Sequence, residues 1–221
     1  MPMELVLLPI VESAFDPFAY SHGRAAGMWQ FIPGTGKRFG MQQNWWYDGR
    51  RDVVASTQGA LDYLTYLNEM FDGNWLHALA AYNSGEGRVQ RAIKANKRAG
   101  KPTDFWNLNL PKETRAYVPK LLALADILKN KDEYAYAWPE VENVAVIEVV
   151  DIGSQVDLAF AAELAGMSLK ELHGLNPGFN RWATSPEGPH RLILPLDKAA
   201  AFSQALAKID QKERLNWVRH S

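Results

Sequence analysis

The apolar residues before about residue 137 recur every three or four positions, which is the spacing of helices that bury one face. No segment before residue 140 shows a convincing alternation of apolar and polar residues, the pattern of a strand. Helices are expected at Pro33–Gly40 and from Trp75 to Asn83-Ser84-Gly85. Between them, another helix is expected to begin after a capping Asp52 and to end at Asp72-Gly73. Further helices are expected around Val89 and Ile93 and from Pro111. The helix around Val89 and Ile93 is expected to end in the stretch from Lys94 to Lys101, which is basic and solvated. These signals predict a mainly α first domain.

The composition changes at Trp138-Pro139, and the elements expected after it are of another kind. The expected order begins with a β-branched strand at 144–150, a short helix at 158–165 and a second short helix at 169–175 that Ser168 caps. A strand at 191–195 and a last helix at 198–214 follow. We therefore predict a mainly α domain over 1–138, a small α+β module with the order βααβ over 139–197, and a C-terminal helix or tail over 198–221.

Composition excludes several kinds of chemistry. The formal net charge is -1, so no overall charge favours nucleic acid or a membrane surface as a partner. The chain has no cysteine, which excludes disulfides, thiolate metal sites and a cysteine nucleophile. Its five histidines are scattered without ligand spacing, so no metal and no cofactor are expected. No apolar stretch approaches the roughly 20 residues of a membrane span.

Glu12 ends the nearly unbroken apolar run that begins at Leu5. In a helix, Leu5, Leu8 and Glu12 would lie on the same apolar side. Loss of water would raise the pKa of this carboxyl and keep it protonated near neutral pH, as a general acid requires. The alternative is a surface glutamate at the end of a helix.

Four motifs in register resemble those of the family 1 lytic transglycosylases. They are Glu12-Ser13, Gly27-Met28-Trp29-Gln30, Ala81-Tyr82-Asn83-Ser84-Gly85, and Glu113-Thr114-Arg115-Ala116-Tyr117-Val118-Pro119. The match covers nearly all of residues 4–130. The longer stretches, from Leu7 to Ser13 and from Tyr82 to Val89, most resemble the membrane-bound lytic murein transglycosylase D subgroup.

The resemblance implies a lysozyme-like fold and a defined activity. Members of the family cleave the β-1,4 bond between N-acetylmuramic acid and N-acetylglucosamine in peptidoglycan, without water, and leave a 1,6-anhydromuramic acid end. By its match to the family's motifs, Glu12 is implied as the single catalytic acid. The other implied site residues, which contact substrate or support Glu12, are Ser21, Gln30, Tyr82, Asn83, Glu113 and Tyr117.

Each supporting residue also has a structural alternative. Tyr82 and Tyr117 can belong to the core, and Gln30 can satisfy backbone groups. Glu113 suits the first turn of a helix through the helix dipole alone, and Asn83 suits a helix break. One departure from the family pattern is that many relatives carry Gly-Leu-Met-Gln where this chain has Gly27-Met28-Trp29-Gln30, so that Trp29 stands in place of methionine. Its bulk is expected to reshape a wall of the substrate cleft.

The sequence offers one well-placed carboxylate, whereas most glycosidases use two. Asp16, before Pro17, fits a turn, and Asp48 and Asp52 fit a loop and a cap. A site with a single acid needs another source of charge stabilisation. The 2-acetamido group of the substrate can supply it, and the muramic C6 hydroxyl can then attack in place of water.

The C-terminal module resembles a LysM domain, a βααβ repeat that binds peptidoglycan. The resemblance rests on Ala162 to Asn176-Pro177 and on the closing Leu192-Ile193-Leu194-Pro195. The usual Gly-Asp-Thr-Leu turn is replaced by Gly153-Ser154-Gln155-Val156-Asp157-Leu158. Glycan binding by the module and simple packing on the catalytic domain both remain open.

Three functions are therefore compared. The preferred one is a lytic transglycosylase whose partner is the peptidoglycan glycan strand. The rivals are a goose-type lysozyme-like hydrolase and a catalytically inert peptidoglycan-binding protein. Met1 to Glu4 runs directly into the first helix without a signal peptide, so the native start is expected upstream. From the substrate, we expect a periplasmic, monomeric protein, with any outer-membrane anchor in a region absent from this chain.

Overall fold

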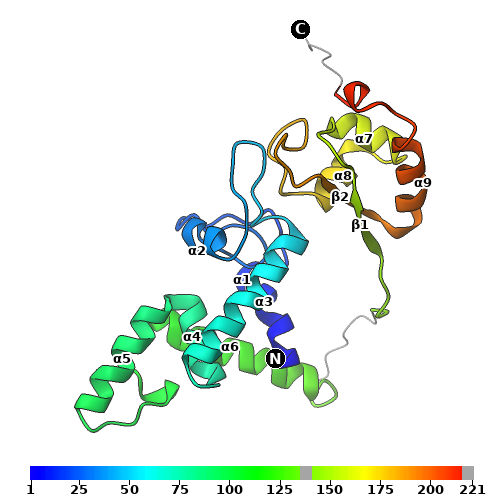
Figure 1. Ribbon diagram of the computed structural model, residues 1–221. Helices are drawn as coiled ribbons and strands as arrows, with labels where there is room; N and C mark the ends of the chain where they lie inside the picture. Colours follow the sequence, from blue (N-terminus) through cyan, green and yellow to red (C-terminus); the bar gives the residue numbers. More distant parts are fainter. Residues whose placement is uncertain (135–140, 216–221) are drawn as a thin grey trace. The chain divides into compact units, whose positions relative to one another are not determined.

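The computed structural model describes residues 1–134 and 141–215, which fall into two compact units. Among the described residues, the first unit holds 1–16, 28–30 and 57–134, and the second holds 17–27, 31–56 and 141–215. The domain boundary expected near residue 138 lies outside the described residues. Each unit is described by itself below, with the element labels of Figure 1.

The first unit is helical. Its elements are η1 (Met3–Leu7), α1 (Leu8–Ser13), most of α3 (Val53–Met70), α4 (Trp75–Ser84), α5 (Glu86–Arg98), η2 (Phe105–Asn107) and α6 (Lys112–Lys129). Helix α4 contacts α5 and α6, and α1 also contacts α6 (Figure 1). Apolar positions that the sequence pattern selects lie in the core, where Leu8, Leu64 and Leu67 are fully buried.

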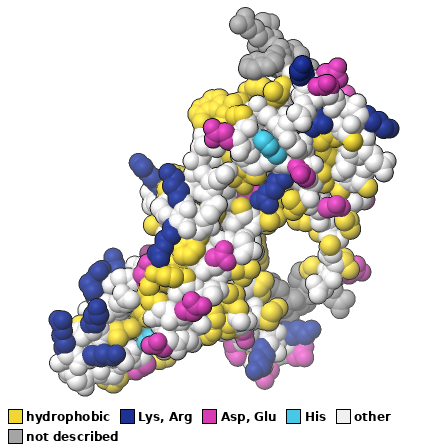
Figure 2. Space-filling model, in the orientation of Figure 1, with side chains coloured by type: hydrophobic (Ala, Val, Ile, Leu, Met, Phe, Trp, Pro, Cys, Tyr) yellow, Lys and Arg dark blue, Asp and Glu magenta, His cyan; other side chains and the backbone are white. Residues whose placement is uncertain are grey.

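Helix α5 is longer than the sequence pattern predicts. The expected loss of helix after Ile93 is wrong, because the helix continues to Arg98. Its end is anchored by Asn96, whose side-chain amide donates to the carbonyls of Pro102 (2.7 Å) and Asn107 (2.9 Å). The last turn also carries Lys97 and Arg98, which suit the negative end of a helix dipole. Figure 2 shows Lys and Arg side chains gathered over this helix, so the expected basic, solvated surface is present on a helix.

The second unit contains the predicted βααβ order. Strand β1 (Ile147–Asp151) pairs antiparallel with β2 (Arg191–Pro195), with Ile147 opposite Pro195. Helices α7 (Leu158–Leu164) and α8 (Leu169–Leu175) lie between the strands in sequence, and α9 (Leu196–Leu206) and η3 (Gln211–Glu213) follow β2. Strand β1 begins three residues later than predicted, since its first residue, Ile147, pairs with the last residue of β2, after which α9 begins.

The last helix is shorter than predicted, because the chain turns back after Leu206. The guanidinium of Arg214 donates to the carbonyl of Leu206 (3.1 Å) and to that of Ile152 (2.7 Å). Arg214 is buried and so closes the end of α9 with a cation, where helix carbonyls lack partners.

Local capping works as the sequence predicts at α8. The Ser168 hydroxyl oxygen accepts from the Glu171 backbone, and the Glu171 carboxylate accepts from the Ser168 backbone, which is a capping box. After the helix, the buried Asn176 side chain pairs with both backbone groups of Ile193 at 2.8 Å. This amide therefore ties the end of α8 to strand β2.

Residues 31–56 share a core with the module in the second unit. This segment contains α2 (Pro33–Arg38) and the buried Tyr47, which belongs to the same apolar cluster as β1, β2, α7 and α9. The Tyr47 hydroxyl donates to Asp52 Oδ2 (2.8 Å), and Arg191 of β2 donates to the same oxygen (3.0 Å). Asp52 Oδ1 accepts from Ala55 N (2.8 Å), so Asp52 caps α3 as predicted.

The described residues are thus mainly helical, with one two-stranded sheet, which confirms the fold class predicted from sequence. Among the described helices, none combines the length and the hydropathy needed to cross a membrane.

Candidate active site

Glu12 lies in the last turn of α1, and its carboxyl is partly buried. Leu8, one turn earlier, is fully buried and holds this side of the helix against the core. The next residue, Ser13, donates from its hydroxyl to the carbonyl of Met28 (3.0 Å). The end of α1 is therefore attached to the Gly27–Gln30 motif, two stretches that are separated in sequence by a long loop.

Burial raises the pKa of Glu12 from 4.5 to about 7. Removal from water is the largest cause, a hydrogen bond from Tyr117 lowers the pKa, and the negative charge of Glu113 raises it again. The expectation that an apolar environment raises this pKa is met. At neutral pH the carboxyl is close to an even mixture of its acid and base forms, which suits a group that must both give and take a proton.

Tyr117 makes a direct contact with the Glu12 carboxyl. Its hydroxyl donates to Glu12 Oε1 at 2.5 Å, the length of a charge-assisted hydrogen bond. Burial and the charge of Glu12 hold the pKa of Tyr117 well above its ordinary value. The phenol therefore stays protonated over the working pH range and serves as a neutral donor.

Tyr82 belongs to the same electrostatic cluster. Burial and then the charge of Glu12 raise the pKa of Tyr82 well above its ordinary value. Its hydroxyl donates to the carbonyl of Trp29 (2.8 Å), and its ring lies 5.3 Å from that of Tyr63. Tyr82 thus links α4 to the Gly27–Gln30 motif.

Asn83 and Glu113 are paired, as their positions in two of the motifs suggest. The Asn83 amide donates to Glu113 Oε1 (3.0 Å), and its oxygen accepts from the Thr114 hydroxyl (2.8 Å). Thr114 is buried, whereas Glu113 is exposed. Sequence reasoning missed Thr114, although it lies inside a quoted motif, because a threonine hydroxyl in a helix has no pattern that reveals a partner from another helix.

Gln30 has a left-handed backbone with φ of 49°, which a non-glycine residue rarely adopts without a constraint. Before it, Trp29 is buried, and its indole N–H donates to Thr57 Oγ1 (3.0 Å). The ring of Trp29 is therefore enclosed in the core, directly before Gln30 in the chain. That its bulk reshapes a wall of the substrate cleft stays a prediction.

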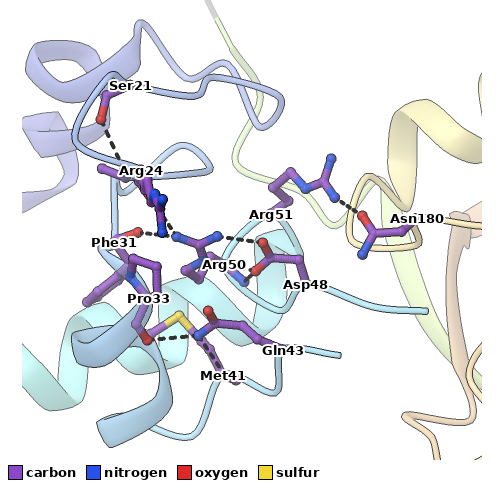
Figure 3. A network of polar contacts seen from close by, with 11 residues as sticks. Ser21, Arg24, Phe31, Pro33, Met41, Gln43, Asp48, Arg50, Arg51 and Asn180 are labelled. Atoms are coloured by element: carbon purple, nitrogen blue, oxygen red, sulfur yellow. Dashed lines mark hydrogen bonds and ion pairs between the residues drawn. The ribbon is translucent and has the colours of Figure 1, made fainter. Parts of the chain in front are cut away.

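Ser21 belongs to the second unit, in a tight turn. Its hydroxyl oxygen accepts from Ala25 N (3.0 Å), and its backbone N–H donates to the carbonyl of Ala25 (2.9 Å). Arg50 stabilises the loop, because its guanidinium donates to the carbonyls of Arg24 (2.7 Å) and Phe31 (3.0 Å) (Figure 3). The Asp48 carboxylate accepts from the same guanidinium at 2.7 Å and neutralises its charge.

Gly27 must be glycine in this loop. Its φ is +79°, and an added Cβ would lie 1.8 Å from the carbonyl oxygen of Arg50. Glycine is thus required at the first position of the Gly27–Gln30 motif, because the Arg50 backbone lies too close for a side chain.

Within residues 1–134 and 141–215, no three His, Asp or Glu side chains gather in a way that could hold a metal ion. Around Glu12 the structure places the phenols of Tyr117 and Tyr82, and a carboxyl with a pKa of about 7 is suited to proton transfer.

Comparison with known proteins places this arrangement in a family. The transglycosylase SLT domain matches residues 1–105, and the LysM-like domain of lytic transglycosylase MltD matches residues 146–211. Membrane-bound lytic murein transglycosylase D of Escherichia coli (strain K12) is 52% identical over 207 residues, which are 94% of this chain and 46% of that protein. This chain thus spans about half the length of that relative.

Two further similarities were found. A protein of Alteromonas sp. (strain M-1) named for tributyltin chloride resistance is 40% identical over 158 residues, 72% of this chain and 74% of its own. The solved structure of lytic transglycosylase Slt from Pseudomonas aeruginosa matches 61% of this chain and 22% of its own, with 26% identity and a TM-score of 0.47. From the two domain matches and the identity to transglycosylase D, the chain belongs to the lytic murein transglycosylase family, in the group that joins an SLT domain to an MltD-type LysM-like domain.

Proposed function

We propose that this protein is a peptidoglycan lytic transglycosylase in which Glu12 acts first as the acid and then as the base. The observation that carries the proposal is the Glu12 carboxyl, partly buried, bonded to Tyr117 and with a pKa of about 7, at the position where the family has its catalytic acid. The substrate is the β-1,4 bond between N-acetylmuramic acid and N-acetylglucosamine.

In the first step, Glu12 gives its proton to the oxygen that links the two sugars, and the bond from that oxygen to C1 of the muramic residue breaks. The oxygen of the muramic 2-acetamido group bonds to C1 and spreads the positive charge over an oxazolinium ring. Glu12 is then a carboxylate, and the hydrogen bond from Tyr117 stabilises this form.

In the second step, the Glu12 carboxylate takes the proton of the muramic C6 hydroxyl. The C6 oxygen bonds to C1, the oxazolinium ring opens to restore the acetamido group, and the product is a 1,6-anhydromuramic end. The proton returns to Glu12, so the site is regenerated without water. The attacking group belongs to the bound sugar, and its proximity replaces the capture of a second reactant.

The remaining site residues are proposed to bind or orient. Asn83, fixed by Glu113 and Thr114, is suited to an acetamido group, since an amide can both donate and accept. Gln30 and Ser21 are proposed to contact the sugar chain. Tyr117 is proposed to orient the Glu12 carboxyl and to tune its pKa.

We also propose the domain division 1–138, 139–197 and 198–221, and a periplasmic location with an outer-membrane anchor supplied by a region outside this chain. The family matches at 1–105 and 146–211 agree with such a division. The E. coli relative is named as a membrane-bound murein enzyme, which supports the location.

The test is the chemistry of the product ends. Purified peptidoglycan digested by this protein is expected to give anhydromuramic ends, and Glu12→Gln is expected to lower the turnover by about 10²–10⁴-fold while the fold is retained. Reducing muramic ends would instead show a hydrolase of the goose-type lysozyme kind. Release of wall material by Glu12→Gln at the wild-type rate, or no release by either form, would reject the role of Glu12.

A further inference from the structure

Three tryptophans form one exposed aromatic surface in the second unit. Trp45 and Trp46 come from the loop between α2 and α3, and Trp182 comes from the loop between α8 and β2. The ring of Trp46 lies 4.8 Å from that of Trp45 and 6.0 Å from that of Trp182, both in edge contact. We call Trp45, Trp46, Trp182 and the neighbouring Arg181 the tryptophan platform.

The outer rings of the platform are open to solvent. Trp45 is 59% exposed and Trp182 is 41% exposed, whereas a tryptophan usually loses most of its surface to the core. Trp46, between them, is partly buried and packs against the core of the module. The platform is therefore anchored at its centre and exposed at both ends.

Hydrogen bonds hold both loops in place before any ligand arrives. The Asn44 side-chain oxygen accepts from the backbone N–H groups of Trp46 and Tyr47, each at 2.8 Å. The Asn180 N–H donates to the carbonyl of Trp46 (2.8 Å), and its side chain accepts from Arg51 (Figure 3). A ligand would not need to order these loops, so little binding energy would be lost on binding.

Arg181 adds a positive charge to the aromatic surface. Its guanidinium carbon lies 3.9 Å from the centre of the Trp45 ring, a cation–π contact, and the side chain is exposed. The contact keeps the guanidinium beside the Trp45 ring, and a guanidinium has N–H groups that can bind a carboxylate.

We propose that the tryptophan platform is a second binding surface for peptidoglycan, separate from Glu12, on which sugar rings stack on Trp45 and Trp182 while a peptide-stem carboxylate pairs with Arg181. A pyranose ring has an apolar C–H face that packs on a flat aromatic ring and hydroxyl edges that remain in water. The cation suits the carboxylates of peptide stems. The inference rests on the proposed function for the identity of the polymer.

The platform is not a property of either matched domain alone. Trp45 and Trp46 lie in the region that matches the SLT domain, whereas Arg181 and Trp182 lie in the LysM-like region. The surface exists because residues 31–56 and the module share one core. It would hold a glycan strand on the protein through successive cleavage events.

The experiment measures binding without cleavage. The full chain carrying Glu12→Gln is sedimented with insoluble purified peptidoglycan at fixed salt, and its apparent Kd is compared with that after adding Trp45→Ala and Trp182→Ala together. We expect the double substitution to weaken binding about tenfold, as for aromatic anchors at the centre of an interface. The matched control is Trp106→Ala, because Trp106 is 61% exposed on η2 in the first unit, and we expect it to bind as the parent does.

Equal binding by the parent and the double variant, or an equal loss with Trp106→Ala, would overturn the proposal. With Glu12 intact, the double variant should cleave a short soluble glycan at the wild-type rate, which also shows that it folds. A loss of that activity would contradict a separate surface. Because the binding assay needs no turnover, it stands apart from the product analysis that tests the proposed function.

Arg181→Gln tests the proposed pairing of Arg181 with a peptide-stem carboxylate. We expect it to weaken binding to peptidoglycan several-fold and to leave binding to chitin, which has acetamido sugars but no peptide stems, unchanged. A similar loss for both polymers, or no loss for peptidoglycan, would contradict the assigned role of Arg181.

Discussion

The groups around Glu12 shift its pKa in opposite directions. Burial and the charge of Glu113 favour the protonated form, and the hydrogen bond from Tyr117 favours the carboxylate. The net pKa of about 7 is therefore a balance, and a change in either contribution moves it in a known direction.

Tyr117→Phe should move the pH profile of the enzyme upward. The first step needs protonated Glu12, so kcat/KM of the wild type should fall as the pH rises through about 7. Loss of the tyrosine hydroxyl removes the contact that lowers the Glu12 pKa, and the alkaline limb should shift to higher pH. Tyr63→Phe is the control, because the Tyr63 hydroxyl donates to Glu86 instead (3.3 Å). A limb that stays in place or moves to lower pH in Tyr117→Phe would contradict the account.

Glu12→Gln should stabilise the fold at alkaline pH. The pKa of Glu12 is about 7 in the folded protein, whereas the ordinary value for a glutamate is 4.5, so the folded state binds the proton more tightly. The wild type therefore loses stability as the pH rises from about 4.5 to 7, and the loss remains above 7. At pH 8 the variant should unfold with a free energy higher by at most about 3.5 kcal/mol, since the pKa rises from 4.5 to about 7 and each pKa unit corresponds to about 1.4 kcal/mol.

Urea unfolding of both forms at pH 4 and pH 8 measures this difference. The two forms should have nearly equal stability at pH 4, where the glutamate is protonated in both the folded and the unfolded chain. A difference in stability that is as large at pH 4 as at pH 8 would contradict this account. It would show that glutamine at position 12 stabilises the fold through packing and that the ionised Glu12 carboxylate does not destabilise it.

At the level of helices, α4 and α6 are joined by a buried polar contact. The Thr114 hydroxyl donates to Asn83 Oδ1, and the Asn83 amide donates to Glu113. Thr114 is 1% exposed, so its hydroxyl has no access to water as an alternative partner. The position of Asn83 therefore depends on a residue that is not expected to touch substrate.

Thr114→Val keeps the shape and removes this donor. We expect a loss of about 1–3 kcal/mol in the free energy of unfolding, since Asn83 Oδ1 is left without the donor that Thr114 supplies. We also expect a higher KM, because the amide is no longer fixed. Thr65→Val is the matched control, because Thr65 lies on α3, is exposed and bonds only to the carbonyl of Leu61 within its own helix (2.8 Å). Equal effects of the two substitutions would argue against an α4–α6 link.

The elements that the sequence predicts well are those set by local signals. The capping box at Ser168, the cap at Asp52 and the end of α4 at Gly85 depend on residues a few positions apart. The errors occur where a distant residue decides the end of an element. Arg214 ends α9 early, and Asn96 keeps α5 helical beyond its apolar positions.

The same division holds in the candidate site. Glu12 and Tyr117 are 105 positions apart, and their contact was expected only through the family motifs, because periodicity gives the face of a helix but not its neighbour. The buried partner Thr114 and the enclosed ring of Trp29 were not expected. Both depend on packing between helices, which no local pattern records.

At the scale of the whole molecule, residues 31–56 and the LysM-like module share one core. Tyr47 lies in that core, and its hydroxyl and the Arg191 guanidinium both meet Asp52 Oδ2. Gly178 allows this packing, since an added Cβ would lie 2.8 Å from the Tyr47 ring. The module therefore supports part of the region that matches the SLT domain.

Arg191→Met should destabilise the protein by about 1–3 kcal/mol, because it leaves the buried Asp52 charge without its cation. Arg191 is partly exposed, so water offsets part of the full cost of breaking a buried pair. Lys170→Met, at an exposed position of α8, should change little. Hydrogen exchange at residues 47–55 should increase in Arg191→Met alone. Unchanged protection there would mean that the module does not stabilise this segment.

The most direct test of the central claim is a titration of the Glu12 carboxyl carbon by 13C NMR. Its signal is assigned as the one that Glu12→Gln removes. The account predicts a midpoint at about pH 7, well above that of the exposed glutamates. A midpoint near the ordinary value of 4.5 would mean that Glu12 is ionised at neutral pH, and it would contradict its role as the acid.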